Sequence, residues 1–166
     1  MFCFFFNFRD RQPSARMVLL KAYSKEGFHI FTNYESRKAR EIEENPKVAL
    51  LFYWDSLNRQ IRVEGKASKV SFQESEEYFH RRPRSSQISA RVSQQSRPIE
   101  DRETLAKRHE EEEQKFSETI PCPDYWGGYK IVPERFEFWQ GQSDRLHDRF
   151  QFDRQNDTWI VTRLQP

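Results

Sequence analysis

The sequence predicts a mainly β protein with peripheral helices, an α+β class whose antiparallel strands commonly close into a barrel. Short runs of aromatic and β-branched residues recur along the chain, and Gly, Pro, Asn or Asp separate them. Three other stretches carry the start and stop signals of helices. Because 166 residues suffice for one compact core, a single domain over residues 1–166 is expected.

The aromatic and β-branched runs predict roughly seven to nine strands. In the first run, Phe2, Phe4, Phe6 and Phe8 recur at every second position as in a strand, and a polar turn follows at 9–12. The strands before the helical region are expected at 2–8, 17–23, 28–33, 48–54 and 60–70. Those near the C-terminus are expected within 127–133, 135–141, 145–152 and 157–164.

Helices are expected where a capping residue precedes a helical pattern. Ser71 and Glu74, for example, have the spacing of a capping box, and Pro83 then ends the helix. The third helix is long and highly charged, with few apolar residues. The three helices are expected from Ser36 to the Asn45-Pro46 pair, from Ser71 to Pro83, and from about Asp101 to Ser117.

The composition favours a soluble globular protein and argues against nucleic-acid binding through bulk charge. Lys and Arg total 28 against 26 Asp and Glu, so any anion site must be local. Cys3 and Cys122 have no CxxC pattern and no neighbouring His, which predicts reduced thiols and no metal site, with a disulfide as the open alternative. The apolar start is too short to span a bilayer and lacks the features of a signal peptide, so a cytoplasmic location is expected.

Basic residues gather at three separated places, two of which lie in the first 40 residues. Arg16 and Lys21 differ in parity, so one regular strand would place them on opposite faces. Arg37 and Lys38 follow the candidate N-cap Ser36, where the helix dipole disfavours positive charge. A phosphate bound at that helix start would reverse the penalty, although ordinary surface charge explains the pattern about equally well.

The third basic cluster surrounds the predicted helix end at Pro83. Tyr78 and Arg82 are four residues apart and share one helix face, and Ser85 or Ser86 can cap whatever follows. A phenol, a guanidinium and a hydroxyl at a helix start suit a phosphate, although an ordinary surface helix end is the commoner explanation. The chain has no Gly-rich phosphate loop, so side chains and helix ends would have to hold any phosphate.

The stretch "RLHDRFQF" at 145–152 predicts a strand with one cationic face. Three basic residues on one face repel one another unless solvent or an anion neutralises them. The alternation also separates His147 from Asp148, which argues against a catalytic dyad. Strand geometry places Arg145, His147, Arg149 and Gln151 on one face, and Leu146, Asp148, Phe150 and Phe152 on the other.

From about Pro13 to Pro166 the chain resembles the pyridoxine/pyridoxamine 5'-phosphate oxidase family of flavin enzymes. Several long motifs in the right order make the resemblance more specific than a lone short pattern. They are "PSARMVLLK", "FTNYESRKA", "FYWDSLNRQIRVEG", "YFHRRPRSSQI", "SQQS", "WGGY", "EFWQGQSDRLHDR" and "RLQP". At the N-terminus, "MFCFFFNFRDRQ" stands where family members usually carry several dozen further residues and a first strand like "ALATV".

The resemblance implies a split β-barrel homodimer with FMN in clefts shared by the subunits and a dimerisation region at about 122–166. The implied FMN contacts are Arg16, Met17, Val18, Leu19, Phe31, Thr32, Arg37, Lys38, Gln60, Gln95 and Ser96, with Trp139 and Arg149 reaching FMN from the other subunit. The implied contacts of the substrate phosphate are Lys21, Tyr78, Arg82 and Ser86, and those of its pyridine ring are Arg145 and His147.

The implied reaction converts pyridoxine 5'-phosphate and pyridoxamine 5'-phosphate to pyridoxal 5'-phosphate. Hydride passes from the substrate's C4' carbon to flavin N5, and O2 is reduced to hydrogen peroxide. Arg145 and His147 are the implied catalytic pair, acting as orienting and charge-tuning groups. One alternative is a non-catalytic truncated isoform that binds FMN or a B6 vitamer, motivated by the N-terminus. A split-barrel flavoprotein that reduces its substrate is disfavoured by "RLHDR" and "YFHRRP".

Overall fold

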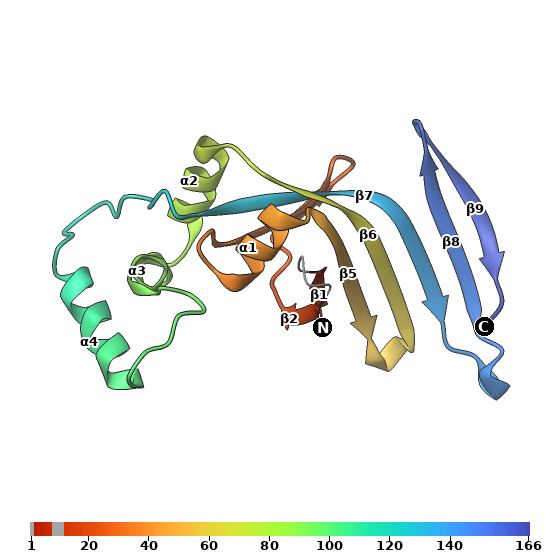
Figure 1. Ribbon diagram of the computed structural model, residues 1–166, viewed down its shortest axis with the longest axis horizontal. Helices are drawn as coiled ribbons and strands as arrows, with labels where there is room; N and C mark the ends of the chain where they lie inside the picture. Colours follow the sequence, from red (N-terminus) through yellow and green to blue (C-terminus); the bar gives the residue numbers. More distant parts are fainter. Residues whose placement is uncertain (1, 8–11) are drawn as a thin grey trace. The chain divides into compact units, whose positions relative to one another are not determined.

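The computed structural model describes residues 2–7 and 12–166, and it contains nine strands and four α-helices in this part of the chain (Figure 1). The strands are β1 (Phe2–Asn7), β2 (Pro13–Met17), β3 (Ala22–Ser24), β4 (Gly27–Asn33), β5 (Lys47–Trp54), β6 (Arg59–Lys69), β7 (Trp126–Gln140), β8 (Asp148–Gln155) and β9 (Thr158–Leu164). The helices are α1 (Arg37–Glu44), α2 (Phe72–Arg81), α3 (Arg84–Val92) and α4 (Arg102–Glu113). Phe8 and most of the turn predicted at 9–12 lie outside the described residues.

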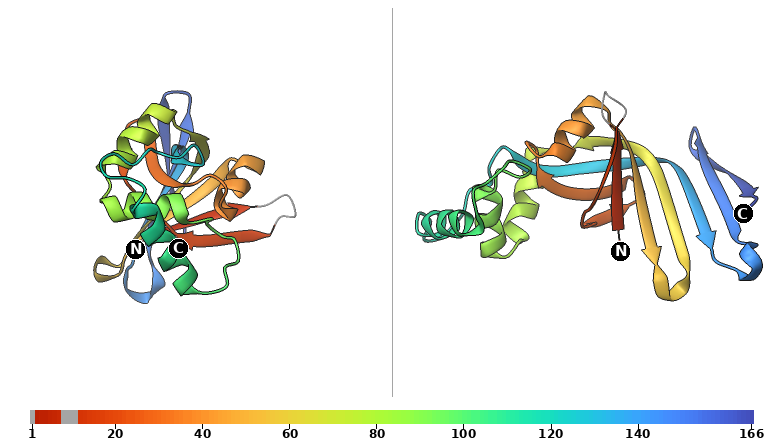
Figure 2. Two further views of the ribbon diagram at one scale, coloured as in Figure 1. Left: turned by 90° about the vertical axis from the view of Figure 1, so that its left-hand side faces the viewer. Right: turned by 60° about the horizontal axis from the view of Figure 1, so that its bottom comes forward.

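The strands form one sheet, and the predicted mainly antiparallel class is confirmed. Along the sheet the order is β2-β1-β5-β6-β7-β4-β3, while β8 pairs with β7 and β9 with β8. The β5–β6 hairpin is the clearest example (Figure 2). Leu50 and Val63 lie opposite each other and are buried, as are the neighbouring pair Val48 and Gly65. Alternate positions of β5 therefore supply one apolar face, as strand geometry requires.

The three predicted helices are present, and the predicted N-cap Ser36 accepts from the Ala39 amide at 3.4 Å at the start of α1. The side chain of Ser71 accepts from the Glu74 amide at the start of α2, and that of Asp101 accepts from the Thr104 amide at the start of α4. A further helix, α3, follows Pro83 directly. Its N-cap is Pro83 itself, so the expectation that Ser85 or Ser86 caps it is wrong.

The strand predicted over 17–23 is wrong, because β2 ends at Met17 and β3 begins at Ala22. The two strands have different partners: Met17 lies opposite Cys3 of β1, whereas Ala22 lies opposite His29 of β4. Between β2 and β3 the chain therefore changes its pairing partner from β1 to β4. Arg16 and Lys21 do not share a strand, and the argument from their parity fails.

Two boundaries near the C-terminus also differ from prediction. The segments expected at 127–133 and 135–141 are one strand, β7, which continues through Pro133 because its fixed φ suits extended backbone. The strand expected over 145–152 begins only at Asp148. Asp144 and Arg145 have φ values of 56° and 60°, which interrupt extended backbone before β8. Arg145 and His147 therefore do not share a strand face with Arg149.

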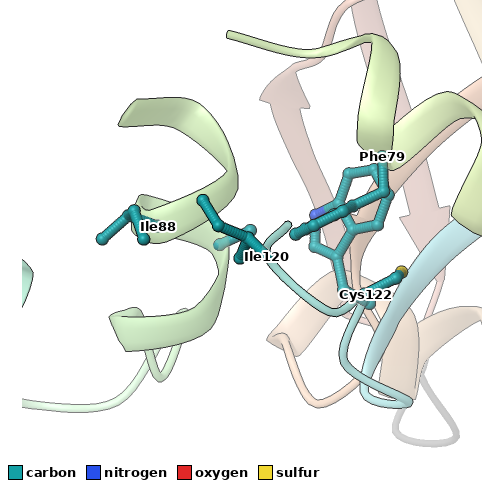
Figure 3. Close-up of a cluster of buried hydrophobic side chains, with 6 residues drawn as sticks. Phe79, Ile88, Ile120 and Cys122 are labelled. Atoms are coloured by element: carbon teal, nitrogen blue, oxygen red, sulfur yellow. The ribbon is translucent and has the colours of Figure 1, made fainter. Parts of the chain in front are cut away.

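The chain groups into two compact units, which are described separately. The first contains the chain up to Ile30, Glu41–Ser68 and Lys130–Pro166, and the second contains Phe31–Arg40 and Lys69–Tyr129. The second unit has its own apolar cluster, in which Phe79, Ile88, Ile120 and Cys122 are buried with Ala90 and Trp126 (Figure 3). Residues 1–166 as one domain stay a prediction.

Candidate cofactor and substrate site

The start of α1, in the second unit, gathers predicted cofactor contacts around a buried lysine. Lys38 is only 6% exposed. Its Nζ donates to Thr32 Oγ1 at 2.7 Å and to Gln95 Oε1 at 2.8 Å. It also lies 3.3 Å from the hydroxyl of the N-cap Ser36. These contacts join Thr32 and Lys38, six residues apart, to Gln95, which lies 57 residues beyond Lys38 in the sequence.

Two further predicted contacts meet at the same helix start. The Arg37 amide donates to Ser96 Oγ at 3.2 Å, while the Arg37 side chain is exposed. Ser96 has a left-handed backbone with φ of 72°, at the turn that follows Gln95. Two cations, hydroxyls and backbone amides at a helix N-terminus are a donor set that fits a phosphate group.

The predicted substrate residues Tyr78 and Arg82 lie around one indole ring. The Arg82 guanidinium carbon is 4.7 Å from the centroid of the Trp126 ring, and the Tyr78 ring is parallel to that indole within 6°. Arg82 caps α2 with extended backbone rather than continuing the helix. The prediction that Tyr78 and Arg82 share a helix face is therefore replaced by a shared contact with Trp126.

Arg82 presents an unsatisfied donor. Its Nη1 is buried and has no hydrogen-bond partner within the described residues. Burial lowers the pKa of the guanidinium from its ordinary value, although the nearby Tyr78 and Cys122 oppose the shift. An anion at this position would satisfy the orphaned N–H and offset the cost of burying the charge. Ser86, half-buried in the first turn of α3, donates its amide to the Pro83 carbonyl.

In the first unit, Arg16 is held by a buried carboxylate of α1. Its Nη2 lies 2.9 Å from Glu41 Oε2 and 2.9 Å from Ser14 Oγ. Ser14 Oγ in turn donates to Glu41 Oε1 at 2.7 Å, and Glu41 is 0% exposed. The carboxylate therefore fixes the guanidinium while 24% of the Arg16 side chain remains accessible.

The other predicted contacts of the first unit are more exposed. Met17 and Leu19 are 54% and 70% exposed, Val18 is half-buried, and Lys21 is exposed with its amide bonded to the His29 carbonyl. A cavity of about 680 Å³ contains two predicted FMN contacts in its lining. These are Gln60 of β6 and Trp139 of β7, beside apolar side chains such as Ile61 and Phe150.

The loop before β8 places His147 against Trp139, with ring centroids 4.7 Å apart. His147 Nδ1 lies 3.1 Å from the Gln142 amide, which can only donate. In the neutral ring the proton is therefore on Nε2, which is left as a donor. Arg145 is exposed and follows Asp144 in the left-handed turn.

The anion beside Arg149 is a protein carboxylate. Arg149 Nη2 and Nε lie 2.9 and 3.2 Å from the two oxygens of Glu137, a residue only 7% exposed on the neighbouring strand β7. Hydrogen bonding to Glu137 raises the pKa of the Arg149 guanidinium. Arg62 Nη1 is 3.4 Å from the same carboxylate. The negative charge that neutralises Arg149 therefore comes from the chain itself.

Sequence reasoning missed three side chains that hold predicted site residues: Glu41, Trp126 and Glu137. Two of them could have been found from the sequence, because Trp126 begins the "WGGY" motif and Glu137 lies two residues before Trp139, on the same face of a strand. The signal of Glu41 was only its position in a short helix. The described residues include no group of three or more His, Cys, Asp or Glu placed to hold a metal ion. None of their helices is long and apolar enough to cross a membrane.

Family models match most of the chain. Residues 8–116 match "Pyridoxamine 5'-phosphate oxidase", and residues 126–166 match "Pyridoxine 5'-phosphate oxidase C-terminal dimerisation region". The pyridoxine/pyridoxamine 5'-phosphate oxidase of Colwellia psychrerythraea is 53% identical over 95% of this chain and 73% of its own length. The pyridoxine-5'-phosphate oxidase of Bos taurus is 50% identical over 95% and 67%, respectively.

Solved structures support the same relationship. PhzG from Burkholderia lata, in complex with tetrahydrophenazine-1-carboxylic acid, has a TM-score of 0.94 at 29% identity and covers 99% of this chain and 81% of its own. An FMN binding protein from Nostoc punctiforme has a TM-score of 0.81 at 13% identity, covering 99% and 87%, and shows the fold alone. The predicted split β-barrel class is thereby confirmed, and the chain belongs to the pyridoxine/pyridoxamine 5'-phosphate oxidase family.

Proposed function

We propose that this protein is an FMN-dependent oxidase that converts pyridoxine 5'-phosphate and pyridoxamine 5'-phosphate to pyridoxal 5'-phosphate. Its family membership supports the activity. The structural observation that carries the proposal is the hydrogen-bonded cluster of Thr32, Lys38 and Gln95 at the start of α1. Its members come from three separate segments, and their donors fit the phosphate of FMN.

The chain's own residues would bind and orient the cofactor. Lys38, Arg37 and Ser96 would hold the FMN phosphate at the start of α1, and Arg16 would present a guanidinium already oriented by Glu41. When bound, FMN supplies the redox chemistry, accepting hydride from the substrate's C4' carbon and passing electrons to O2. Gln60, another predicted contact, would bind from the wall of the 680 Å³ cavity.

The substrate residues divide by role. Tyr78 and Arg82 would hold the substrate phosphate, because Arg82 Nη1 is a buried donor that lacks a partner within the described residues. Ser86 and Lys21 are assigned to the same phosphate by family resemblance. His147 would donate from Nε2 to the pyridine ring or its substituents, and the exposed Arg145 would orient the ring.

The assembly we propose is a homodimer with FMN bound between the subunits. The C-terminal dimerisation region matched by residues 126–166 supports it, and these residues include Trp139 and Arg149. In such a dimer the two side chains would reach the cofactor held by the other subunit. A cytoplasmic location stays a prediction from the sequence.

An anaerobic absorption experiment tests the function. We expect the purified protein to be yellow, to lose its flavin absorbance when pyridoxamine 5'-phosphate is added without oxygen, and to regain it with hydrogen peroxide formation when air is admitted. Light scattering during size exclusion would establish whether the sample is a dimer. A protein that stays colourless at saturating FMN contradicts the proposal. A dimer that binds both ligands without bleaching favours the alternative of a non-catalytic protein that binds FMN or a B6 vitamer.

A further inference from the structure

We propose that Trp126 is a positioning residue for the substrate phosphate, because its indole face orients the Arg82 guanidinium that would bind this group. The inference rests on the proposed function and deepens it. Family resemblance assigns the phosphate to Arg82 and Tyr78 and gives no role to Trp126, the first residue of the "WGGY" motif. The structure adds the contact between these residues.

Trp126 belongs to a stack of three rings beside the guanidinium. The Phe31 ring centroid is 3.9 Å from that of Tyr78 and 5.7 Å from that of Trp126, with interplanar angles of 23° and 20°. Arg82 lies over the indole at 4.7 Å, within the range of a cation–π contact. Trp126 is only 6% exposed, so it has little freedom to move away.

The arginine is held without an acidic partner. Within the described residues Arg82 makes no ion pair, whereas Arg16, Arg91 and Arg149 each pair with a glutamate. A carboxylate beside Arg82 would orient the guanidinium but would also repel a dianionic phosphate. An aromatic face attracts the cation and carries no net charge. Trp126 can therefore orient Arg82 while leaving its full positive charge for the ligand.

Backbone contacts fix the rest of Arg82. Its amide donates to the Phe79 carbonyl at 3.1 Å, and Gln87 Nε2 donates to the Arg82 carbonyl at 2.8 Å. These bonds set where the side chain begins but not where the guanidinium points. The indole is the nearer of two rings beside the guanidinium, at 4.7 Å against 5.9 Å for Phe79, and it supplies the stronger second constraint. The buried Nη1 is the donor that the phosphate would satisfy.

The test is a comparison of steady-state kinetics in the FMN-loaded enzyme. Trp126→Leu should raise KM for pyridoxamine 5'-phosphate, and the inhibition constant of inorganic phosphate, by roughly 5- to 30-fold, while kcat changes by less than about twofold. FMN affinity, measured by fluorescence titration, should stay within about twofold. If KM and the inhibition constant are unchanged while the variant folds, Trp126 has no positioning role.

The matched control is Phe116→Leu. Phe116 packs against the same apolar cluster and carries a cation–π contact with Arg91 at 4.8 Å, outside the predicted phosphate site. It should lower thermal stability as Trp126→Leu does, but leave KM and phosphate inhibition unchanged. Equal kinetic effects of the two variants would mean that general loosening of the cluster is the cause, and would overturn the proposal.

A second variant covers failure of Trp126→Leu to fold. Trp126→Phe keeps an aromatic ring, and we expect KM to rise at least about twofold in the wild-type background but not in an Arg82→Met background, which lacks the cation. An effect that persists without Arg82 refutes the inference. The proposed function fails separately: in that case the wild-type enzyme itself shows no turnover, whatever the variants do.

Discussion

Replacing Glu41 with Gln removes the buried negative charge that holds Arg16, with little change in shape. Arg16 Nη2 and Glu41 Oε2 are 2.9 Å apart, which corresponds to an attraction of about 6 kcal/mol at an effective dielectric constant of about 20. Removing one partner of a buried pair typically costs about 3–5 kcal/mol. Because 24% of the Arg16 side chain is exposed, and Gln can still accept from Ser14, we expect about 2–3 kcal/mol.

Thermal unfolding followed by circular dichroism measures this loss. For a chain of this size, about 2–4 °C per kcal/mol predicts that Glu41→Gln lowers the melting temperature by roughly 4–12 °C. Glu44→Gln is the control, because Glu44 is exposed at the end of the same helix. A melting temperature within about 1 °C of wild type would refute Glu41 as the counter-ion of Arg16.

The double variant Arg16→Met with Glu41→Leu separates stability from cofactor binding. Replacing both charges with apolar groups should recover most of the lost stability, since a buried ion pair adds little over well-packed apolar residues. It should not recover FMN affinity if Arg16 binds the cofactor. Recovery of both properties would contradict the predicted role of Arg16.

Two further predictions concern the loop before β8 and the apolar cluster of the second unit. Arg145→Ala should lower turnover by about 100-fold and leave FMN retention unchanged, because the residue is predicted to orient the substrate. Stopped-flow kinetics measures turnover, and FMN titration measures retention. Equal losses of turnover and FMN retention would contradict that role. Burial raises the pKa of the Cys122 thiol from 9.0 to about 11, so above pH 9 the unfolded chain loses its thiol proton before the folded chain does. Stability should therefore fall by up to roughly 2 kcal/mol between pH 9 and 11 and be fully retained below pH 9. Urea midpoints at pH 8 and 10.5 measure it, and Cys122→Ala should show a smaller alkaline loss; identical losses would exclude the thiol as the cause.

The boundaries of α2 were predictable because their causes are local. The cap at Ser71 and the stop at Pro83 each involve residues within one or two turns of the helix end. The end of β2 at Met17 was not predictable in this way. It depends on β1 as the hydrogen-bonding partner, and the sequence does not state which strands pair.

The candidate site shows the same division. Motif resemblance predicted Thr32, Lys38 and Gln95 as cofactor contacts. The fold then brings Gln95 within hydrogen-bonding distance of Lys38 and Thr32, which precede it by 57 and 63 residues. Alternation along 145–152 failed to find the partner of Arg149, because Glu137 lies on another strand and the register between them is a tertiary property. The roles of these residues in binding stay predictions.

The left-handed turn formed by Asp144 and Arg145 has a consequence for protein engineering. A non-glycine residue in this conformation costs about 1 kcal/mol, and arginine gains little of the local hydrogen bonding that helps Asn or Asp tolerate it. A redesign scored on melting temperature alone would therefore favour Gly or Asn at position 145 and discard the guanidinium. Libraries of thermostable variants of this chain need to be ranked by turnover as well, because substitutions at position 145 that raise the melting temperature are expected to lower turnover.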